Sequence, residues 1–414
     1  MARENFYTAV DIGTNKVCAI LARVGSEGEL KILGTGIAVS QGVQKGRIES
    51  IKEVKAAVAA SLEEAQRYVG RDVVSGVYAT ISGTHISCLN TQDELRGFED
   101  LDGVTSQQLH QLIQSSFPHV DATQEVLHVI PIGYEVDGLS GVRNPTGLHA
   151  SKVQIESHVV LGDATTIKNT VKAIEVGKVS VNSLVLQSLA SAEATLTGDE
   201  REMGVVLADI GAGTCDVSIY RDGHPWYSTV LPVGGSQLTR DLAVALRVPY
   251  HMAEEIKVKW GNVMPESIRA DEEVVIPGVQ GQPKRVVKRR GLCEPLHLRM
   301  IEMLKLIMLR VSQAGLRQLP TGGLVITGGS AEIAGLKQLV ESNMGGQVRI
   351  AYPNGIAGLP SQLRKPAFSA GVGALLWGIK HQGERRTYQN GERTLWGYKS
   401  LARRFGRSRE QVTR

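Results

Sequence analysis

Two segments of this 414-residue chain each combine an aspartate with a glycine-rich turn, a composition suited to binding phosphate and a metal ion. Each follows an apolar run, and the two aspartates, Asp11 and Asp209, stand 198 positions apart. Glycine turns expose backbone N–H groups that can bind phosphate oxygens, and an aspartate at a strand end can hold Mg²⁺ through water. One Asp-Ile-Gly is usually only a β-turn, but two copies could clamp a nucleotide from both sides. The segments contain Asp11, Gly13, Thr14, Asn15 and Lys16, and Asp209, Gly211, Gly213 and Thr214.

A third segment, Val-Ile-Thr-Gly-Gly-Ser-Ala at 325–331, runs from an apolar strand into a glycine pair. Without side chains, Gly328 and Gly329 permit close approach of a flat base and a ribose. We expect Ser330 to cap a following helix. This segment therefore predicts a binding surface for a nucleoside.

Two further features precede or lie on predicted helices. Gly234 and Gly235 stand before a helix near residue 238, where free backbone amides favour a phosphate. Glu254 and Lys257 are three residues apart and share a helix face. Such a pair is usually a solvated salt bridge.

Regular elements must position these residues, and the pattern of apolar residues predicts them in two halves. In the first half we expect two strands at 6–24, a β segment at 28–40, a helix at 51–68, a strand at 77–81 and helical structure at 164–196. Residues 85–163 interrupt this half with a different residue pattern. It predicts a polar helix near 106–116 and strands at 126–136 and 152–161. In the second half we expect strands at 203–220 and 324–327, helices at 238–247, 251–260, 296–319 and 367–379, and a hairpin at 273–290.

Composition sets the class of protein. The chain is 42% hydrophobic and 21% charged, which is ordinary for a soluble protein of two or more domains. Its formal net charge is only +4, so the chain as a whole lacks the basic excess that is typical of nucleic-acid-binding proteins. Its cysteines, Cys18, Cys88, Cys215 and Cys293, form no C-x-x-C pair, and the ten histidines show no metal spacing. No stretch approaches the roughly 20 apolar residues of a membrane span. We therefore expect a protein of a reducing, cytoplasmic compartment.

The basic residues gather in the tail. Polar residues 380–393 read as a flexible linker, and 394–414 as an amphipathic helix with an apolar arc of about 120° beside a basic face. Such a helix can lie in the headgroup plane of an anionic membrane. Core packing and a nucleic-acid arm are weaker alternatives. The membrane-facing residues would be Leu395, Trp396, Lys399, Leu401, Arg403, Arg404 and Phe405.

In this order, the segments resemble those of the actin, Hsp70 and sugar-kinase superfamily and, within it, the FtsA family of bacterial division proteins. The resemblance covers nearly the whole chain. It implies an actin-like α/β fold, two ribonuclease-H-like halves around a nucleotide cleft, with an inserted α+β subdomain of the FtsA type at 85–163. The motifs are V-D-I-G-T at 10–14, L-A-D-I-G-A-G-T-C-D-V at 207–217, L-P-V-G-G at 231–235, A-E-E-I-K-V-K-W-G at 253–261 and I-T-G-G-S-A at 326–331.

The resemblance also divides the chain into parts. The expected parts are the first half at 1–84 and 164–200, the insertion at 85–163, the core of the second half at 201–237, its small subdomain at 238–319, the remaining core with a return helix at 320–379, the linker at 380–393 and the membrane-targeting helix at 394–414.

The same resemblance implies ATP and Mg²⁺ as ligands. Thr14, Asn15 and Lys16 would lie on the phosphates, Asp11 and Asp209 near Mg²⁺, and Glu254 and Lys257 beside the adenosine. Gln187 would orient the attacking water. Since Gln187-Ser188 replaces the Glu-Pro of efficient relatives and an amide is a poor general base, we expect at most slow hydrolysis.

Two classes of function follow. The first is an ATP-loaded scaffold that polymerises, binds the C-terminal peptide of the tubulin-like FtsZ through the small subdomain at 238–319, tethers FtsZ filaments to the cytoplasmic face of the cell membrane at the division site, and recruits later division proteins. The second is a small-molecule kinase or chaperone-type ATPase of the same fold. A pilus-assembly relative is a third possibility, but such relatives lack the tail. Fold alone does not separate these.

Overall fold

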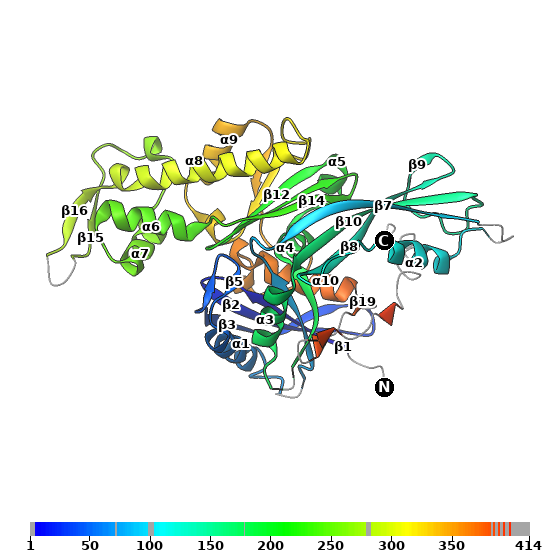
Figure 1. Ribbon diagram of the computed structural model, residues 1–414. Helices are drawn as coiled ribbons and strands as arrows, with labels where there is room; N and C mark the ends of the chain where they lie inside the picture. Colours follow the sequence, from blue (N-terminus) through cyan, green and yellow to red (C-terminus); the bar gives the residue numbers. More distant parts are fainter. Residues whose placement is uncertain are drawn as a thin grey trace.

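Two β-sheets, one in each half of the chain, carry the glycine turns (Figure 1). The computed structural model describes residues 5–70, 73–97, 103–177, 179–278 and 283–381, together with the pairs 384–385, 388–389, 392–393 and 397–398. The first sheet has the order β21-β20-β11-β6-β1-β2-β3. Its strands are β1 (Asn5–Ile12), β2 (Lys16–Val24), β3 (Leu30–Val39), β6 (Gly76–Ile81), β11 (Ser180–Leu186), β20 (Tyr388–Gln389) and β21 (Glu392–Arg393).

The second sheet repeats the arrangement at the centre of the first. β1 pairs antiparallel with β2 and parallel with β6, while β12 pairs antiparallel with β13 and parallel with β17. The internal repeat of the sequence is thus a repeat of topology. The sheet has the order β14-β13-β12-β17-β18 and consists of β12 (Val205–Ile210), β13 (Cys215–Arg221), β14 (His224–Leu231), β17 (Leu324–Thr327) and β18 (Val348–Ile350).

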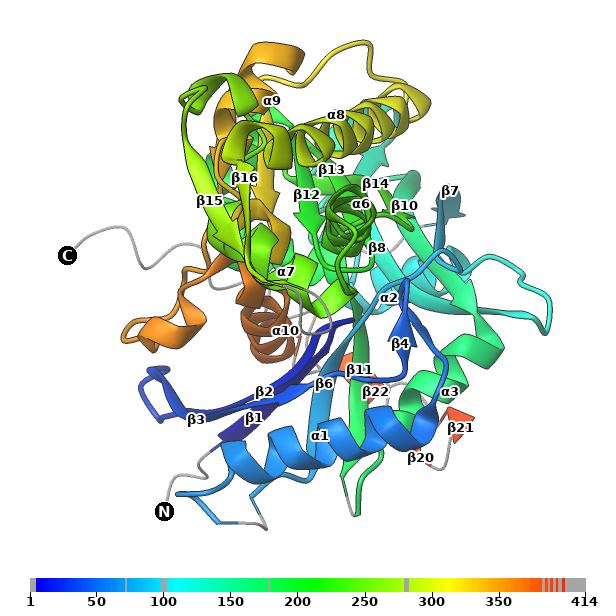
Figure 2. The ribbon, with the colours of Figure 1, turned by 90° about the vertical axis from the view of Figure 1, so that its left-hand side faces the viewer.

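Helices cover both faces of the first sheet. α1 (Ile51–Ala65) and α3 (Ala164–Ile174) pack together on one side, and α10 (Ser369–Lys380) crosses the other (Figure 2). α10 also packs on α4 (Gln187–Thr195), which in turn contacts β12 and β13, so the two helices lie between the sheets. A Cβ on Gly373 would overlap the carbonyl of Ala190, and the helices therefore cross backbone to backbone.

One apolar core runs through this layer into the second sheet. Val205 and Leu207 of β12 belong to the core of the first half, whereas the alternate residues Val206 and Ala208 face the core of the second. This alternation follows from the two-residue period of a strand. The second half is completed by α5 (Gly198–Met203), α9 (Leu336–Met344) and the 3₁₀ turns η2 (Gly329–Glu332), η3 (Ser361–Leu363) and η4 (Pro366–Phe368).

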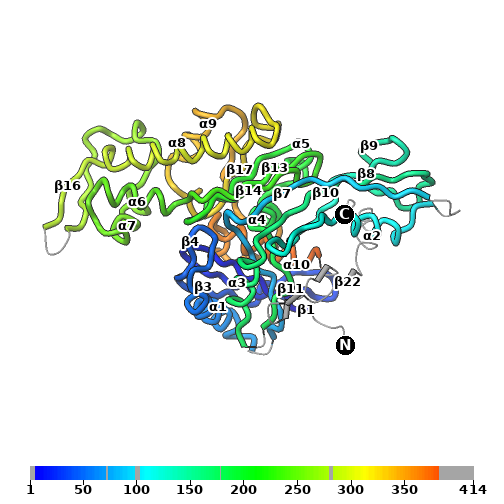
Figure 3. The backbone as a smooth tube through the Cα atoms, in the orientation of Figure 1, coloured from blue at the N-terminus to red at the C-terminus, as the bar shows by residue number. Residues whose placement is uncertain are grey.

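The inserted subdomain and the small subdomain lie at opposite ends of the molecule (Figure 3). The insertion has a sheet of order β7-β10-β8-β9, formed by β7 (Ser87–Arg96), β8 (Gln124–Val136), β9 (Leu139–Val142) and β10 (Lys152–Asp163), with α2 (Ser106–Ser115) against it. The small subdomain contains α6 (Gly235–Leu246), α7 (Tyr250–Trp260), η1 (Pro265–Ser267), β15 (Glu273–Ile276), β16 (Arg285–Lys288) and α8 (Arg289–Gln313).

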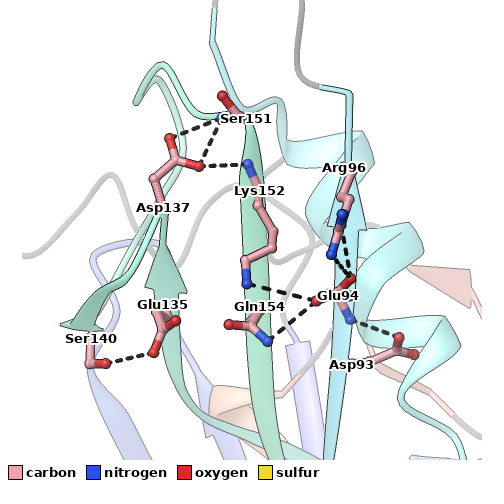
Figure 4. A network of polar contacts seen from close by, with 9 residues as sticks. All are labelled: Asp93, Glu94, Arg96, Glu135, Asp137, Ser140, Ser151, Lys152 and Gln154. Carbon is pink, nitrogen blue, oxygen red and sulfur yellow. Dashed lines mark hydrogen bonds and ion pairs between the residues drawn. The ribbon is translucent and has the colours of Figure 1, made fainter.

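A polar network extends across the strands of the insertion (Figure 4). Asp137 accepts hydrogen bonds from the backbone N–H of Ser151 at 3.0 Å and of Lys152 at 2.7 Å. Glu94 pairs with Arg96 at 2.8 Å. Because exposed ion pairs contribute little stability, we assign this network to the surface of the subdomain rather than to a site.

Three expectations about elements differ from the structure. Residues 164–196 are not all helical, because β11 lies between α3 and α4. β11 passes directly from Leu186 into α4 at Gln187, with no glycine or proline to mark the change. The long helix starts at residue 289, before Pro295, and ends at 313, close to Gly315 with its positive φ of 87°.

The third difference concerns the tail. Within 380–393, where a linker was expected, β20 pairs with β11, and β19 (Glu384–Arg385) pairs with β22 (Gly397–Tyr398). Gly397–Tyr398 is thus a short strand and not part of the helix expected at 394–414. An isolated amphipathic helix without an apolar surface to cover is marginal in water, which accounts for this difference. The remaining residues of 394–414, including Leu395, Trp396, Lys399, Leu401, Arg403, Arg404 and Phe405, lie outside the described residues.

The four cysteines are free. Within the described ranges, no helix has both the length and the apolar character needed to cross a membrane.

Candidate functional site

The first glycine turn joins β1 to β2. The Gly13 N–H donates to the carbonyl of Lys16 at 2.9 Å, which holds the buried Asp11 at the end of β1. Thr80 of β6 donates its hydroxyl to Asp11 Oδ1 at 2.7 Å. Burial raises the pKa of Asp11, and the Lys16 charge and the Thr80 hydrogen bond oppose this rise. A buried carboxylate of this kind is stabilised by a nearby cation.

The rest of this turn is already engaged. Lys16 Nζ contacts the carbonyl of Ala367 and lies 4.5 Å from the ring centroid of Phe368, just before α10. Asn15 is exposed, and its carbonyl accepts the Ser40 N–H at 3.1 Å. Lys16 therefore ties the turn to the segment that returns from the second half, and would have to leave Ala367 to bind a phosphate.

The second turn, between β12 and β13, closes in the same way. The Gly211 N–H donates to the carbonyl of Thr214 at 2.9 Å. Asp209, at the end of β12, accepts hydrogen bonds from Ser191 Oγ and, at 3.4 Å, from Gln187 Nε2, both on α4. Burial raises the pKa of Asp209 to about 6, with the charge of Asp11 adding to the rise. Gln187, the expected water-orienting residue, thus lies beside the second aspartate.

The two turns face each other. A Cβ on Gly213 would overlap the hydroxyl of Thr14, so the two turns approach each other closely at this point. Asp11 lies close enough to Asp209 for its charge to add to the raised pKa of Asp209. The two halves therefore bring phosphate-type turns and carboxylates to one place.

A third buried carboxylate, Asp216 of β13, joins the halves directly. Its Oδ2 accepts hydroxyl hydrogen bonds from Ser82, at the end of β6, and from Thr214, both at 2.9 Å. Its Oδ1 is buried without a hydrogen-bond partner among the described residues. Burial and the neighbouring Asp209 raise the pKa of Asp216 to about 8.

The amides at Gly234 and Gly235 are not free, contrary to expectation. The Gly235 N–H donates to the carbonyl of Gly211 at 2.9 Å, and the Ser236 N–H to that of Ala212 at 2.8 Å. A Cβ on Gly234 would lie 2.6 Å from the Gly211 oxygen. The start of α6 therefore supports the second turn, because the carbonyls of the turn take up its amides.

Glu254 and Lys257 form a partly buried network rather than a solvated pair. Lys257 Nζ donates to Glu254 Oε2 at 2.7 Å, to Thr239 Oγ1 at 2.8 Å and to the carbonyl of Gly235 at 3.3 Å. This network joins α7 to the start of α6, next to the second turn.

The glycine pair after β17 is placed differently from expectation. Gly328 has a φ of 88°, and a Cβ there would overlap Asp209 Oδ1, so this glycine allows close packing on the end of β12. A Cβ on Gly329 would meet only Ala367, at 3.7 Å. Ser330 does not cap a helix; it donates its hydroxyl to the carbonyl of Gly211 at 2.9 Å.

The structure thus gathers the sequence-predicted residues of both halves around the two turns. Sequence reasoning missed the hydroxyl and acidic residues that support them, because serine and threonine are common and carry no spacing signal. Asp216 stood within the motif at 207–217, where the repeated aspartate-glycine pattern drew attention to Asp209 alone. The missed residues are Thr80, Ser82, Ser191, Asp216 and Thr239.

These residues fit a nucleotide with Mg²⁺. Little room is left for side chains where the turns approach each other, and burial raises the pKa of all three carboxylates although the Lys16 charge partly offsets this at Asp11 and Asp209. In the described part of the chain, no three His, Cys, Asp or Glu side chains gather as a direct metal-binding group. Magnesium commonly keeps several waters and binds to few carboxylates together with phosphates, which suits this arrangement.

Comparison with known proteins places this architecture in a family. A family model described as "Cell division protein FtsA" matches residues 206–373, and one described as "SHS2 domain inserted in FTSA" matches 83–161. The cell division protein FtsA of Pseudomonas aeruginosa is 32% identical over 375 residues, covering 91% of this chain and 89% of that protein. FtsA of Escherichia coli is 34% identical over 391 residues, covering 92% and 91%.

Solved structures agree on the fold. A PilM–PilN type IV pilus biogenesis complex contains a chain with a TM-score of 0.63 at 14% identity, covering 90% of this chain and 98% of that one. MreB5 of Spiroplasma citri bound to AMPPNP gives a TM-score of 0.50 at 13% identity, covering 92% and 97%. The actin-like fold with an inserted subdomain is confirmed.

Proposed function

Because this chain belongs to the FtsA family of cell division proteins, we propose that it is an ATP-binding, polymer-forming scaffold that tethers FtsZ filaments to the cytoplasmic membrane and recruits later division proteins. The observation that best supports ATP binding is that the two glycine turns meet, with Asp11 and Asp209 beside them and Thr14 against Gly213. Two half-sites on separate sheets suit a ligand with several charged groups in a row.

In this proposal each residue has a stated task. The amides of the turns at 13–16 and 211–214 bind phosphate oxygens, and Asp11 and Asp209 hold Mg²⁺ through water. Glu254, Lys257 and Ser330 line the adenosine side, and Gly329, where an added Cβ would contact only Ala367, borders the base. Bound ATP supplies a polyanion that draws the halves together and a phosphoanhydride that can be cleaved.

Hydrolysis should be slow. Gln187 donates an amide hydrogen to Asp209 and carries no carboxylate, so it can orient a water but is a poor general base. The scaffold would therefore act mainly in its ATP-bound state. The structure of MreB5 of Spiroplasma citri, which shares this fold, contains AMPPNP and supports a nucleotide as the ligand.

The membrane and FtsZ parts rest on the family and on the tail sequence. We assign the FtsZ C-terminal peptide to the small subdomain of α6, α7 and α8, and membrane attachment to residues 394–414, which would become helical on an anionic surface. The protein would then be peripheral on the cytoplasmic face of the membrane at the division site.

Calorimetric titration of the full chain with ATP and with ADP, with and without Mg²⁺, tests the nucleotide part. We expect Mg²⁺-dependent binding that Asp209→Asn weakens by about tenfold or more, because metal-supporting carboxylates typically contribute 10–100-fold. Asp199→Asn, which removes an exposed carboxylate on α5, is the control and should change nothing. A wild-type protein that binds neither nucleotide would contradict the proposal. A turnover near the ~10 s⁻¹ of metabolic enzymes would favour the alternative, a kinase or chaperone-type ATPase.

A further inference from the structure

A small hairpin of the first half reaches the site, and none of the motifs includes it. β4 (Val43–Gln44) and β5 (Arg47–Ile48) are joined by a two-residue turn, Lys45-Gly46. Both turn residues have positive φ, 49° for Lys45 and 77° for Gly46, the signature of a type I′ turn. Asparagine is preferred at the first position, and a lysine there is strained.

The tip of this hairpin lies between the two halves. A Cβ on Gly46 would come within 2.7 Å of the Ser82 carbonyl and would overlap Gly83, so the tip packs on the end of β6. The backbone nitrogen of Lys45 is 3.3 Å from the position that a Cβ on Gly213 would take. Lys45 therefore reaches the second glycine turn at the point where Thr14 also meets it.

Backbone hydrogen bonds fix the base of the hairpin. The Glu49 and Ser50 N–H groups donate to the carbonyl of Gly42 at 2.8 and 3.2 Å, and the Ser40 N–H donates to the carbonyl of Asn15. The segment leading into the hairpin is thus tied to the first glycine turn. A change in the conformation of the first glycine turn would therefore shift the tip of the hairpin.

The buried carboxylates near the tip of the hairpin would be stabilised by a cation. Asp11, Asp209 and Asp216 are buried nearby, whereas Lys16 is held by Ala367 and Phe368. The Lys45 side chain is exposed and makes no ion pair with any described residue. Strained backbone conformations such as the positive φ of Lys45 are concentrated at functional sites, which favours a functional role for this residue.

We propose that the Lys45-Gly46 turn is a third phosphate-contacting element, in which Lys45 binds the terminal phosphate of a nucleoside triphosphate and so distinguishes it from the diphosphate. This inference rests on the proposed nucleotide site. Lys45 is a binding residue that adds a contact made only with the longer ligand. The same contact bridges the halves, since the phosphate lies on the second turn and Lys45 on the first half.

The test compares ATP and ADP affinities of the full chain, measured with Mg²⁺ by calorimetry. Lys45→Asn removes the cation but keeps the turn, because Asn-Gly is the favoured type I′ pair, so its melting temperature should equal or exceed that of the wild type. We expect ATP affinity to fall about tenfold, equivalent to about 1.4 kcal/mol, with ADP affinity unchanged. Lys45→Arg should keep the preference for ATP.

Lys55→Gln, which removes an exposed lysine on α1, is the matched control and should behave as the wild type. Unchanged ATP affinity in folded Lys45→Asn would overturn the inference, as would equal loss of ATP and ADP binding or a wild type without preference for ATP. If the wild type bound neither ATP nor ADP, the proposed function itself would be rejected. The failure of the inference and the failure of the proposed function are therefore distinguishable.

Discussion

At Asp216, hydrogen bonds that favour the charged carboxylate oppose burial, which disfavours it. It is a fully buried carboxylate that accepts two hydroxyl hydrogen bonds across the halves, yet its pKa is raised to about 8 by burial and by Asp209. A group whose pKa is higher in the folded state binds protons more tightly there. Its contribution to folding stability is therefore present at low pH and lost as the pH rises from about 4 to about 8.

Asp216→Asn should remove this pH dependence. The amide oxygen can still accept from Ser82 and Thr214, but no charge develops, so we expect the variant to melt above the wild type by roughly 1 °C for each kcal/mol regained. The difference should grow from pH 6.5 to 8 and then level off. Melting curves across this range, above the region where His158 contributes, measure it. Asp199→Asn is the control, and a difference that is constant with pH would contradict the pKa argument.

At this scale the sequence predicted the residues that need a special backbone, but not those that support them. Gly213 and Gly328 were found because glycine repeats are visible; Gly328 excludes a Cβ, and Gly213 lies against Thr14 of the first turn. Ser82 and Ser191 were not found, since a hydroxyl acquires its role only when distant strands meet. Ser330 was expected to cap a helix, but it lies within the short 3₁₀ turn η2.

Among the elements, β10 contacts the second half through His158, next to the contacts that Asn90 and Cys88 of β7 make with β14. His158 is fully buried; its Nδ1–H donates to Asn90 Oδ1 on β7 at 2.8 Å, and Ser228 Oγ on β14 donates to its Nε2 at 3.0 Å. Burial lowers the pKa of His158 to about 4. The neutral ring therefore holds three strands together, and the stability it provides is lost as the pH falls from about 6.5 toward 4.

His158→Leu should lower the free energy of unfolding by about 1–3 kcal/mol, because it removes the ring that bonds both Asn90 and Ser228. The variant should also lose less stability than the wild type on acidification from pH 6.5 to 4. Chemical denaturation at several pH values tests both effects. His119→Leu, on an exposed part of the insertion, serves as control. A variant as stable as the wild type at pH 7 would show that the contact does not hold the insertion in place.

Several element types were predictable where a turn residue separated them, although β7, β14, α9 and β18 were missed. The hairpin at 273–290 and the helices at 51–68 and 251–260 agree with β15, β16, α1 and α7 within a few residues. β11 was not found, because it runs into α4 without an interruption. The placement of the insertion against β14 depends on pairing between distant segments, which periodicity does not report.

For the whole molecule, the proposed membrane attachment depends on assembly. One tail offers the burial of Leu395, Leu401 and Phe405, roughly 1.5–3 kcal/mol each. Each basic residue adds about 1 kcal/mol at an anionic surface, while ordering the helix costs about 1–2 kcal/mol per residue. A single tail should therefore bind weakly, and a polymer firmly, through effective concentration.

Phe405→Glu should abolish co-sedimentation with anionic vesicles while ATP binding persists, and high salt should weaken the wild-type interaction by screening the basic residues. Tyr68→Glu, at a position that is 88% exposed far along the chain from the tail, is the control and should sediment as the wild type. Co-sedimentation that survives both deletion of 394–414 and high salt would remove the tail from the proposal.

The close backbone crossing of α4 and α10 at Ala190 and Gly373 is the contact about which we expect a rotation of the two halves to pivot. α4 starts at Gln187 beside Asp209, while Gly371 of α10 lies against Asp11, so both acidic residues sit close to the pivot. In a rigid rotation, displacement grows with distance from the axis. A small turn about this crossing would leave the two aspartates almost in place and sweep the insertion and the small subdomain, at the far ends of the lever, through the largest arcs.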